Sequence, residues 1–161
     1  MRILGLDYGD SRIGVALSDE FGWTAAPLEV IDNKRGQRKA HRRITELIAQ
    51  KDVHTVVVGY PVNMNGTLGP RVQVTDEFCL RLAARNPGIE IVKWDERLTT
   101  VAADRTMREL GVKQEVKGYS DMLAAAFILQ GYLDSLRSKA EAGNTDAGDT
   151  GAGDIEEKSE S

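Results

Sequence analysis

Four acidic residues stand where predicted strands end or a predicted helix begins: Asp7, Asp95, Glu96 and Asp121. Carboxylates gathered at one edge of a sheet can carry phosphoryl chemistry. Asp7 closes an apolar run, and a carboxylate in that position is costly unless a cation or a hydrogen bond compensates it. Asp95 and Glu96 follow the run IEIVKW, and Asp121 lies in the first turn of the last predicted helix.

A divalent cation is the compensation that this residue set favours. Carboxylates that converge without a cation repel one another and partly protonate. Hard cations such as Mg²⁺ or Mn²⁺ bind oxygen ligands, and two such ions ~3.5–4 Å apart stabilise the attacking and leaving oxygens of a phosphodiester cleavage. His41 and His54 lie away from these motifs in the sequence, which disfavours zinc. The spacing alone leaves open a second interpretation, in which the acids are helix caps and surface carboxylates.

The elements that must position these acids can be predicted from the hydrophobic pattern. Three strands come first, and helices and strands then alternate along the chain. Strands are predicted at 3–6, 12–18, 25–32, 53–61 and 89–94, and helices at 37–50, 71–85, from 99 or 100 to 110, and at 121–137. This order predicts an α/β fold with a mixed five-stranded sheet: three antiparallel strands, then alternating helices and strands, with helices on both faces.

In such a sheet the first and fifth strands end at the same edge, which is where open α/β sheets generally bind ligands. Asp7 and the pair Asp95 and Glu96 are therefore expected there. Small residues on the face of the last helix that carries Asp121 let this helix pack close to the sheet. Asp121 is then brought to the edge where Asp7 lies.

Charge divides the chain into two parts. Seven acids and one lysine after residue 140 account for −6, so the first 140 residues carry +2 of the net charge of −4. Residues 140–161 are rich in Gly, Ala, Thr and acids, and such a composition predicts a disordered acidic tail. Residues 1–139 are predicted to form one folded domain. Within it, the run KRGQRKAHRR at 34–43 holds six Lys and Arg and no acid, which is compatible with a polyanionic ligand.

Other classes of protein are disfavoured. No apolar stretch reaches the length of a membrane-spanning helix, so no membrane partner is expected. The N-terminus meets Asp7 too early for a secretory signal. A single cysteine, Cys79, forms no internal disulfide and no Cys-rich zinc site. These features predict a reduced, cytoplasmic protein.

Four blocks of the sequence resemble one known family. They are LGLDYGDSRIGVALSD, VVVGYPVNMNGTLGPR, WDERLTT and SDMLAAAFILQGYLD, in that order over about residues 2–136. Their order and spacing are similar to those of the YqgF family, also called RuvX, the Holliday-junction-resolvase-like pre-16S rRNA nucleases. The resemblance implies an RNase H-like fold, which agrees with the element order predicted above.

The resemblance also implies roles for individual residues. The expected metal ligands are Asp7, Glu96 and Asp121, which would bind Mg²⁺ or Mn²⁺, with two ions expected. Asp95 stays open as the alternative to Glu96, because alternation places the two on opposite faces only if the strand continues that far. Both are kept as candidate catalytic acids with Asp7 and Asp121. The arginines in the same blocks are candidate phosphate contacts, namely Arg12, Arg71 and Arg97.

Three functions follow as hypotheses. The first is a metal-dependent nuclease that processes the 5′ end of precursor 16S rRNA, with RNA, on or off the small ribosomal subunit, as its partner. The second is a Holliday junction resolvase that acts on four-way, branched DNA, which requires a two-fold dimer. The third is a non-catalytic RNA- or ribosome-binding module that uses the basic run at 34–43. The sequence leaves the oligomeric state open.

Overall fold

The sheet positions every feature discussed below. The computed structural model of the chain describes residues 1–98 and 118–160, with side chains through residue 142. Its elements are β1 (Arg2–Tyr8), β2 (Arg12–Ser18), β3 (Ala25–Asp32), α1 (Gln37–Gln50), β4 (Val53–Tyr60), α2 (Pro70–Arg85), β5 (Glu90–Asp95), the 3-10 turn η1 (Glu96–Leu98) and α4 (Tyr119–Glu160). The helix predicted between 99 and 110 lies outside the described residues.

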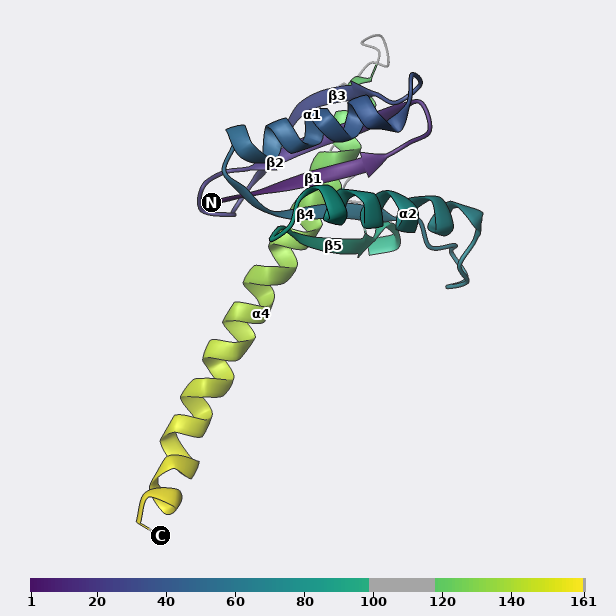
Figure 1. Ribbon diagram of the computed structural model, residues 1–161. Coiled ribbons are helices and arrows are strands. Elements are labelled where there is room, and N and C mark those ends of the chain that lie inside the picture. Colours follow the sequence, from purple (N-terminus) through teal and green to yellow (C-terminus); the bar gives the residue numbers. More distant parts are fainter. Residues whose placement is uncertain (99–117, 161) are drawn as a thin grey trace.

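The predicted mixed five-stranded sheet is confirmed. Its strand order is β3-β2-β1-β4-β5. β1 pairs antiparallel with β2, and β2 pairs antiparallel with β3. β4 is parallel to β1 on its other side and to β5. Helices cover both faces, since α1 and α2 lie on one face while α4 crosses the other (Figure 1).

Alternation along β1 divides its side chains between the two faces. Leu4, Leu6 and Tyr8 join the core under α1 and α2, where the Tyr8 ring stacks on Phe78 with centroids 4.3 Å apart. Ile3 faces α4 and belongs to the smaller core there. Because successive side chains of a strand point to opposite faces, Asp7 shares the α4 face with Ile3.

α4 packs directly onto the backbone of the sheet. A Cβ placed on Gly5 of β1 would lie 2.7 Å from Leu129 Cβ, so only glycine fits under the helix at this point. Ala125, Ile128 and Leu129 of α4 are buried in the core on this face. The predicted close approach of this helix to the sheet is therefore confirmed, and Gly5 of β1 makes room for it.

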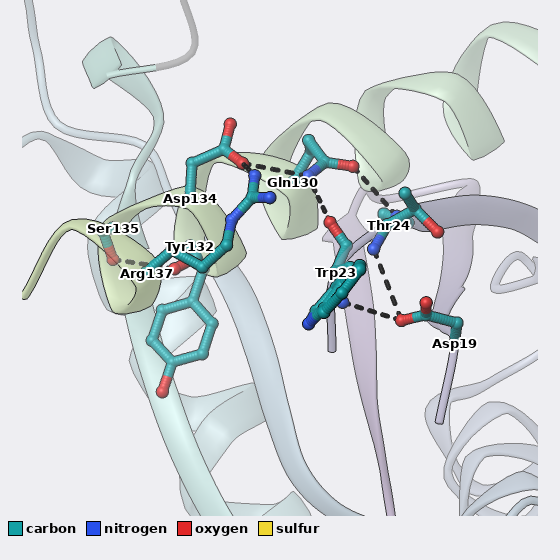
Figure 2. A network of polar contacts seen from close by, with 9 residues as sticks. Asp19, Trp23, Thr24, Gln130, Tyr132, Asp134, Ser135 and Arg137 are labelled. Carbon is teal, nitrogen blue, oxygen red and sulfur yellow. Dashed lines mark hydrogen bonds and ion pairs between the residues drawn. The ribbon is translucent and has the colours of Figure 1, made fainter. Parts of the chain in front are cut away.

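Hydrogen bonds tie α4 to the loop between β2 and β3. The Gln130 amide accepts a hydrogen bond from Ala25 N at 2.9 Å and donates one to the carbonyl oxygen of Trp23 at 3.0 Å. The Asp19 carboxylate in turn accepts one from Trp23 N at 2.7 Å (Figure 2). These contacts fix α4 near Gln130 at the end of the sheet away from Asp7.

α4 is longer than predicted. It begins at Tyr119 and is helical to Glu160, whereas the sequence pattern predicts a helix that ends near Arg137. The continuation leads away from the sheet (Figure 1). Among the described side chains, the last buried apolar one is Leu133. The division into a domain at 1–139 and a disordered tail at 140–161 stays a prediction. Every helix in the described ranges is too short or too polar to cross a lipid bilayer.

We expect Gly14→Ala to destabilise the protein by about 1–3 kcal/mol, the usual cost of overpacking. A Cβ on Gly14 would lie 1.9 Å from the carbonyl oxygen of Asp121, so the start of α4 must move away from β2. Urea unfolding followed by circular dichroism measures the change. Gly88→Ala is the control, because Gly88 has no neighbour within 4 Å and reports only the strain of a positive φ. A Gly14→Ala variant as stable as the wild type would contradict the close packing of α4.

Candidate active site

Asp7 lies near the end of β1, the central strand, on the face that α4 covers. It is half-buried, and no hydrogen bond or ion pair to its carboxylate is formed within the part of the chain that the structure describes. Burial raises the pKa of Asp7 to about 6, with further increases from the charges of Glu96 and Asp121 and a smaller decrease from Arg71. Two other carboxylates therefore lie close enough to disfavour the Asp7 charge.

Asp121 comes to this edge over a glycine of the neighbouring strand. Gly14 of β2 is the register partner of Asp7. Because it has no side chain, the backbone of Asp121 sits directly on it, as the 1.9 Å to a hypothetical Cβ shows. α4 thereby starts beside Asp7. The first turn of α4 therefore lies directly over Gly14.

Glu96 lies on the other side of Asp7, over Gly59 of β4. Leu6 pairs with Val58, so Asp7 and Gly59 follow at the same level on adjacent parallel strands. A Cβ on Gly59 would lie 2.9 Å from Glu96 Oε2 and 2.6 Å from Ile128 Cδ1. The Glu96 side chain thus folds back over β4 in the space that Gly59 leaves. Burial raises the pKa of Glu96, Arg71 opposes this, and Asp95 adds to it.

Asp95 has a different environment from Glu96. Its carboxylate accepts hydrogen bonds from Arg97 Nε at 3.0 Å and Arg97 Nη2 at 2.6 Å, and from the Arg97 backbone N at 2.9 Å. The hydrogen bonds from the Arg97 side chain hold the pKa of Asp95 below its usual range. Asp95 is the last residue of β5, and η1 starts at the next residue. The two acids therefore do not alternate as they would on a continuing strand.

The three acids lie side by side at one end of the sheet, but their side chains do not converge tightly. Asp7 is in the middle, Asp121 lies over Gly14, and Glu96 lies over Gly59. Within residues 1–98 and 118–142, no three His, Cys, Asp or Glu side chains are gathered tightly enough to hold a metal ion as they stand. The Asp121 carboxylate is engaged elsewhere, because its Oδ2 accepts a hydrogen bond from Arg12 Nε at 2.7 Å.

Comparison with known proteins places the chain in a family. The family model described as "RuvX: Holliday junction resolvase" matches residues 1–135. The chain belongs to the RuvX family. This confirms the resemblance on which the expectations for individual residues depend.

Curated relatives and a solved structure are also similar to this chain. A protein of Ruminiclostridium cellulolyticum named "Putative pre-16S rRNA nuclease" is 55% identical over 137 residues, covering 84% of this chain and 96% of the relative. One of the same name from Acetivibrio thermocellus is 54% identical over 136 residues, with the same coverage. RuvC of T. thermophilus in complex with a Holliday junction substrate matches with a TM-score of 0.55 and 18% identity, covering 84% of this chain and 96% of that one. This likeness shows the fold, which is the predicted RNase H-like one.

The three arginines in the RuvX sequence blocks all donate hydrogen bonds to carboxylates, and one of them also donates to a backbone carbonyl oxygen. Arg12 is paired with Asp121, as described above. Arg71, in the first turn of α2, donates to Asp10 Oδ1 at 2.8 Å and to the carbonyl oxygen of Tyr8 at 3.2 Å. Arg97 is paired with Asp95. Arg71, Arg97 and Glu96 also line a cavity of about 400 Å³ under the loop between β4 and α2. Their predicted role as phosphate contacts stays a prediction.

Gly14 and Gly59 are the positions whose role the sequence could not predict. Each is on a strand next to β1, each faces α4, and each leaves the space that one acid occupies. A glycine within a strand often marks close approach of another backbone or a ligand. The pattern alone does not say which, because the approaching residues are 37 or more positions away in this RuvX chain.

Proposed function

We propose that this chain is a divalent-metal-dependent nuclease whose centre consists of Asp7, Glu96 and Asp121. The observation that supports this most strongly is the pair of glycines that admit Glu96 and Asp121 on either side of Asp7. A half-buried carboxylate between two others, with a pKa of about 6, is repelled by both, and a bound cation would offset this repulsion. The oxygen-only donor set fits Mg²⁺ or Mn²⁺.

The three acids would hold the metal, which when bound supplies charge neutralisation at the phosphate and a water of lowered pKa. The protein's own residues position the substrate. Arg71 lies beside Asp7 and Glu96, and its side chain is 45% exposed, so it can contact a phosphate oxygen without leaving the site. Arg12 can move from Asp121 to a phosphate when Asp121 turns toward Asp7. No side chain is needed as a covalent nucleophile.

The substrate we propose is precursor 16S rRNA, because curated relatives that are 55% and 54% identical to this chain are named for it. The 5′ end as the place of cleavage is what the family resemblance implies. Four-way DNA is the second candidate, because the family model is described as a Holliday junction resolvase. Incubating the purified protein with a 5′-extended 16S precursor and with a four-way junction, each with Mg²⁺ or Mn²⁺, distinguishes them. We expect cleavage of the rRNA alone. Cleavage of the junction alone, by a protein that light scattering shows to be a dimer, would favour the resolvase. Cleavage of neither substrate would contradict a nuclease function.

Replacing Arg12 with glutamine should tighten Mn²⁺ binding up to about fivefold in the absence of nucleic acid. The Arg12–Asp121 pair is partly exposed, and such pairs contribute ~0.2–1 kcal/mol, which is the energy a metal must overcome to recruit Asp121. Isothermal titration calorimetry with Mn²⁺ measures the change. Arg97→Gln is the matched control, since it frees Asp95 instead and should leave affinity unchanged. Weaker Mn²⁺ binding by the Arg12 variant would contradict Asp121 as a ligand.

A further inference from the structure

A set of unpaired cations covers the start of α1. Five residues make up this α1 cluster: Lys34, Arg35, Arg38, Lys39 and Arg42. All five are exposed, and none forms an ion pair with a residue that the structure describes. The next cation, Arg43, behaves differently, because it binds Glu29 at 2.8 Å and Glu46 at 3.0 Å. The cluster is therefore a concentration of positive charge that the described residues leave without ion pairs.

α2 adds two cations to the same surface. Arg81 donates a hydrogen bond to Oε1 of Gln37, the first residue of α1. Arg81 and Arg85 are exposed and form no ion pair with any described residue. Burial, followed by the charges of Arg85 and Arg81, lowers the pKa of His41 in α1 to about 4. Both arginines thus lie close to the first two turns of α1, and together with the α1 cluster they form what we call the basic surface.

The basic surface begins at the edge of the sheet that carries Asp7. Gln37 Nε2 donates to the Tyr8 hydroxyl at 3.0 Å, and Tyr8 is the residue after Asp7. Asn33, just before the cluster, donates through Nδ2 to the carbonyl oxygen of Gly9 at 2.9 Å. The loop that starts α1 is therefore fastened to the loop that leaves β1. A strand passing the candidate site can continue around this edge onto α1 and α2.

The chemistry of the surface favours a polyanion rather than a membrane. The apolar side of α1 is buried, with Ala40, Ile44, Leu47 and Ile48 in the core, so the helix has no second apolar face to insert into lipid. Arginine and lysine side chains spaced along a helix suit phosphate oxygens, which fix the position of a nucleic acid without reading its sequence. Asp32, Glu46 and Glu77 are the acids that border the surface in sequence. The Asp32 carboxylate accepts a hydrogen bond from Lys34 N, and Glu46 is paired with Arg43.

We propose that the basic surface binds the sugar-phosphate backbone of an RNA strand that extends from the cleavage site. This proposal rests on the proposed function for the kind of nucleic acid, but the binding itself is independent of catalysis. The surface would hold the substrate away from the scissile phosphate. It would thereby position the RNA over the edge of the sheet where Asp7 lies.

The test is RNA binding in EDTA, so that no cleavage intervenes. A labelled RNA of the 5′ leader of 16S precursor is titrated by fluorescence anisotropy at 50–300 mM salt. The triple variant Arg35→Gln/Arg38→Gln/Arg42→Gln should bind about 10- to 100-fold more weakly. Its slope of log affinity against log salt should be shallower by about 2, since each phosphate contact to a single strand contributes ~0.7.

Two further variants make the result specific. Arg2→Gln/Lys51→Gln/Arg137→Gln removes the same charge from elsewhere on the domain and should change affinity less than threefold. Arg81→Gln/Arg85→Gln should weaken binding as the α1 triple does, which tests whether the surface spans both helices. Equal losses in the two triples, or no loss in the α1 triple with unchanged circular dichroism, would overturn the proposal.

The outcome is separable from that of the proposed function. If the α1 triple variant binds and cuts RNA as the wild type does, the proposed RNA binding by the basic surface is wrong and the proposed nuclease function is unaffected. If the wild type binds RNA through this surface but cuts no substrate with Mn²⁺, the proposed nuclease function is wrong and the proposed RNA binding is unaffected.

Discussion

Asp7→Asn should abolish cleavage and at the same time stabilise the protein above pH 6 when no metal is present. Activity should fall at least ~100-fold, since loss of a group that merely orients a metal ligand costs 10–100-fold and Asp7 is proposed as a ligand itself. The gain in stability follows from the cost of the Asp7 charge. Burial, with Glu96 and Asp121, raises the pKa of Asp7 from 3.8 to about 6.

The sign and the pH range of this gain are fixed by linkage. The folded state holds the Asp7 proton more tightly than the unfolded state does, so this group favours folding below about pH 4. The advantage disappears as the pH rises to about 6, above which the ionised Asp7 disfavours folding. Asparagine carries no charge at any pH. The difference between variant and wild type should therefore grow from pH 4 to 6 and level off at about 2 kcal/mol, allowing for partial exposure.

Urea unfolding in EDTA at several pH values measures this difference. Asp10→Asn is the control, because Asp10 is an exposed acid three residues further on and is paired with Arg71. It should show no such gain. An Asp7 variant that is less stable than the wild type at pH 8 would mean that the carboxylate has a structural role, and would contradict its assignment to a metal centre.

Glu96→Gln should lower cleavage at least ~100-fold, whereas Asp95→Asn should lower it less than tenfold. Glu96 lies over Gly59 beside Asp7, and its charge contributes to the raised pKa of Asp7. Asp95 accepts side-chain hydrogen bonds from Arg97 at 3.1, 3.0 and 2.6 Å. The difference should be in kcat, measured with the 5′-extended 16S precursor and saturating Mn²⁺.

The two variants control for each other, because they remove the same charge from adjacent residues. The pKa of Asp7 should also fall in Glu96→Gln and stay the same in Asp95→Asn, which carboxyl carbon NMR can follow. A larger loss in Asp95→Asn than in Glu96→Gln would assign the metal to the other acid and contradict the geometry described here.

The sequence predicted the architecture because each strand carries a local signal. β2 alternates Ile13, Val15 and Leu17 with small residues, and β4 is a β-branched run that a glycine and a proline follow. These signals depend only on near neighbours. α4 is the exception, since it is helical to Glu160 through a glycine-rich stretch in which local propensity predicts no helix. The helical continuation is not accounted for by any buried apolar side chain after Leu133 among the described ones.

The candidate site was predictable as a set of acids but not as an arrangement. Alternation could not separate Asp95 from Glu96, because the answer depends on where β5 stops. The chain turns into η1 at Glu96, and this turn sends the two side chains to different partners. The pairing of Arg12 with Asp121 joins residues 109 positions apart, and no pattern in one sequence indicates it. Gly14 and Gly59 likewise acquire their meaning only when α4 and η1 pack against them.

The central claim is that Asp7, Glu96 and Asp121 make a metal-dependent nuclease, and one cleavage assay tests it most directly. The 5′-extended 16S precursor is incubated with wild type and Asp7→Asn, purified identically, in Mn²⁺ and in EDTA. We predict 5′-end cleavage only by the wild type and only in Mn²⁺. Cleavage that persists in EDTA, or that the Asp7 variant carries out as fast as the wild type, would contradict the claim.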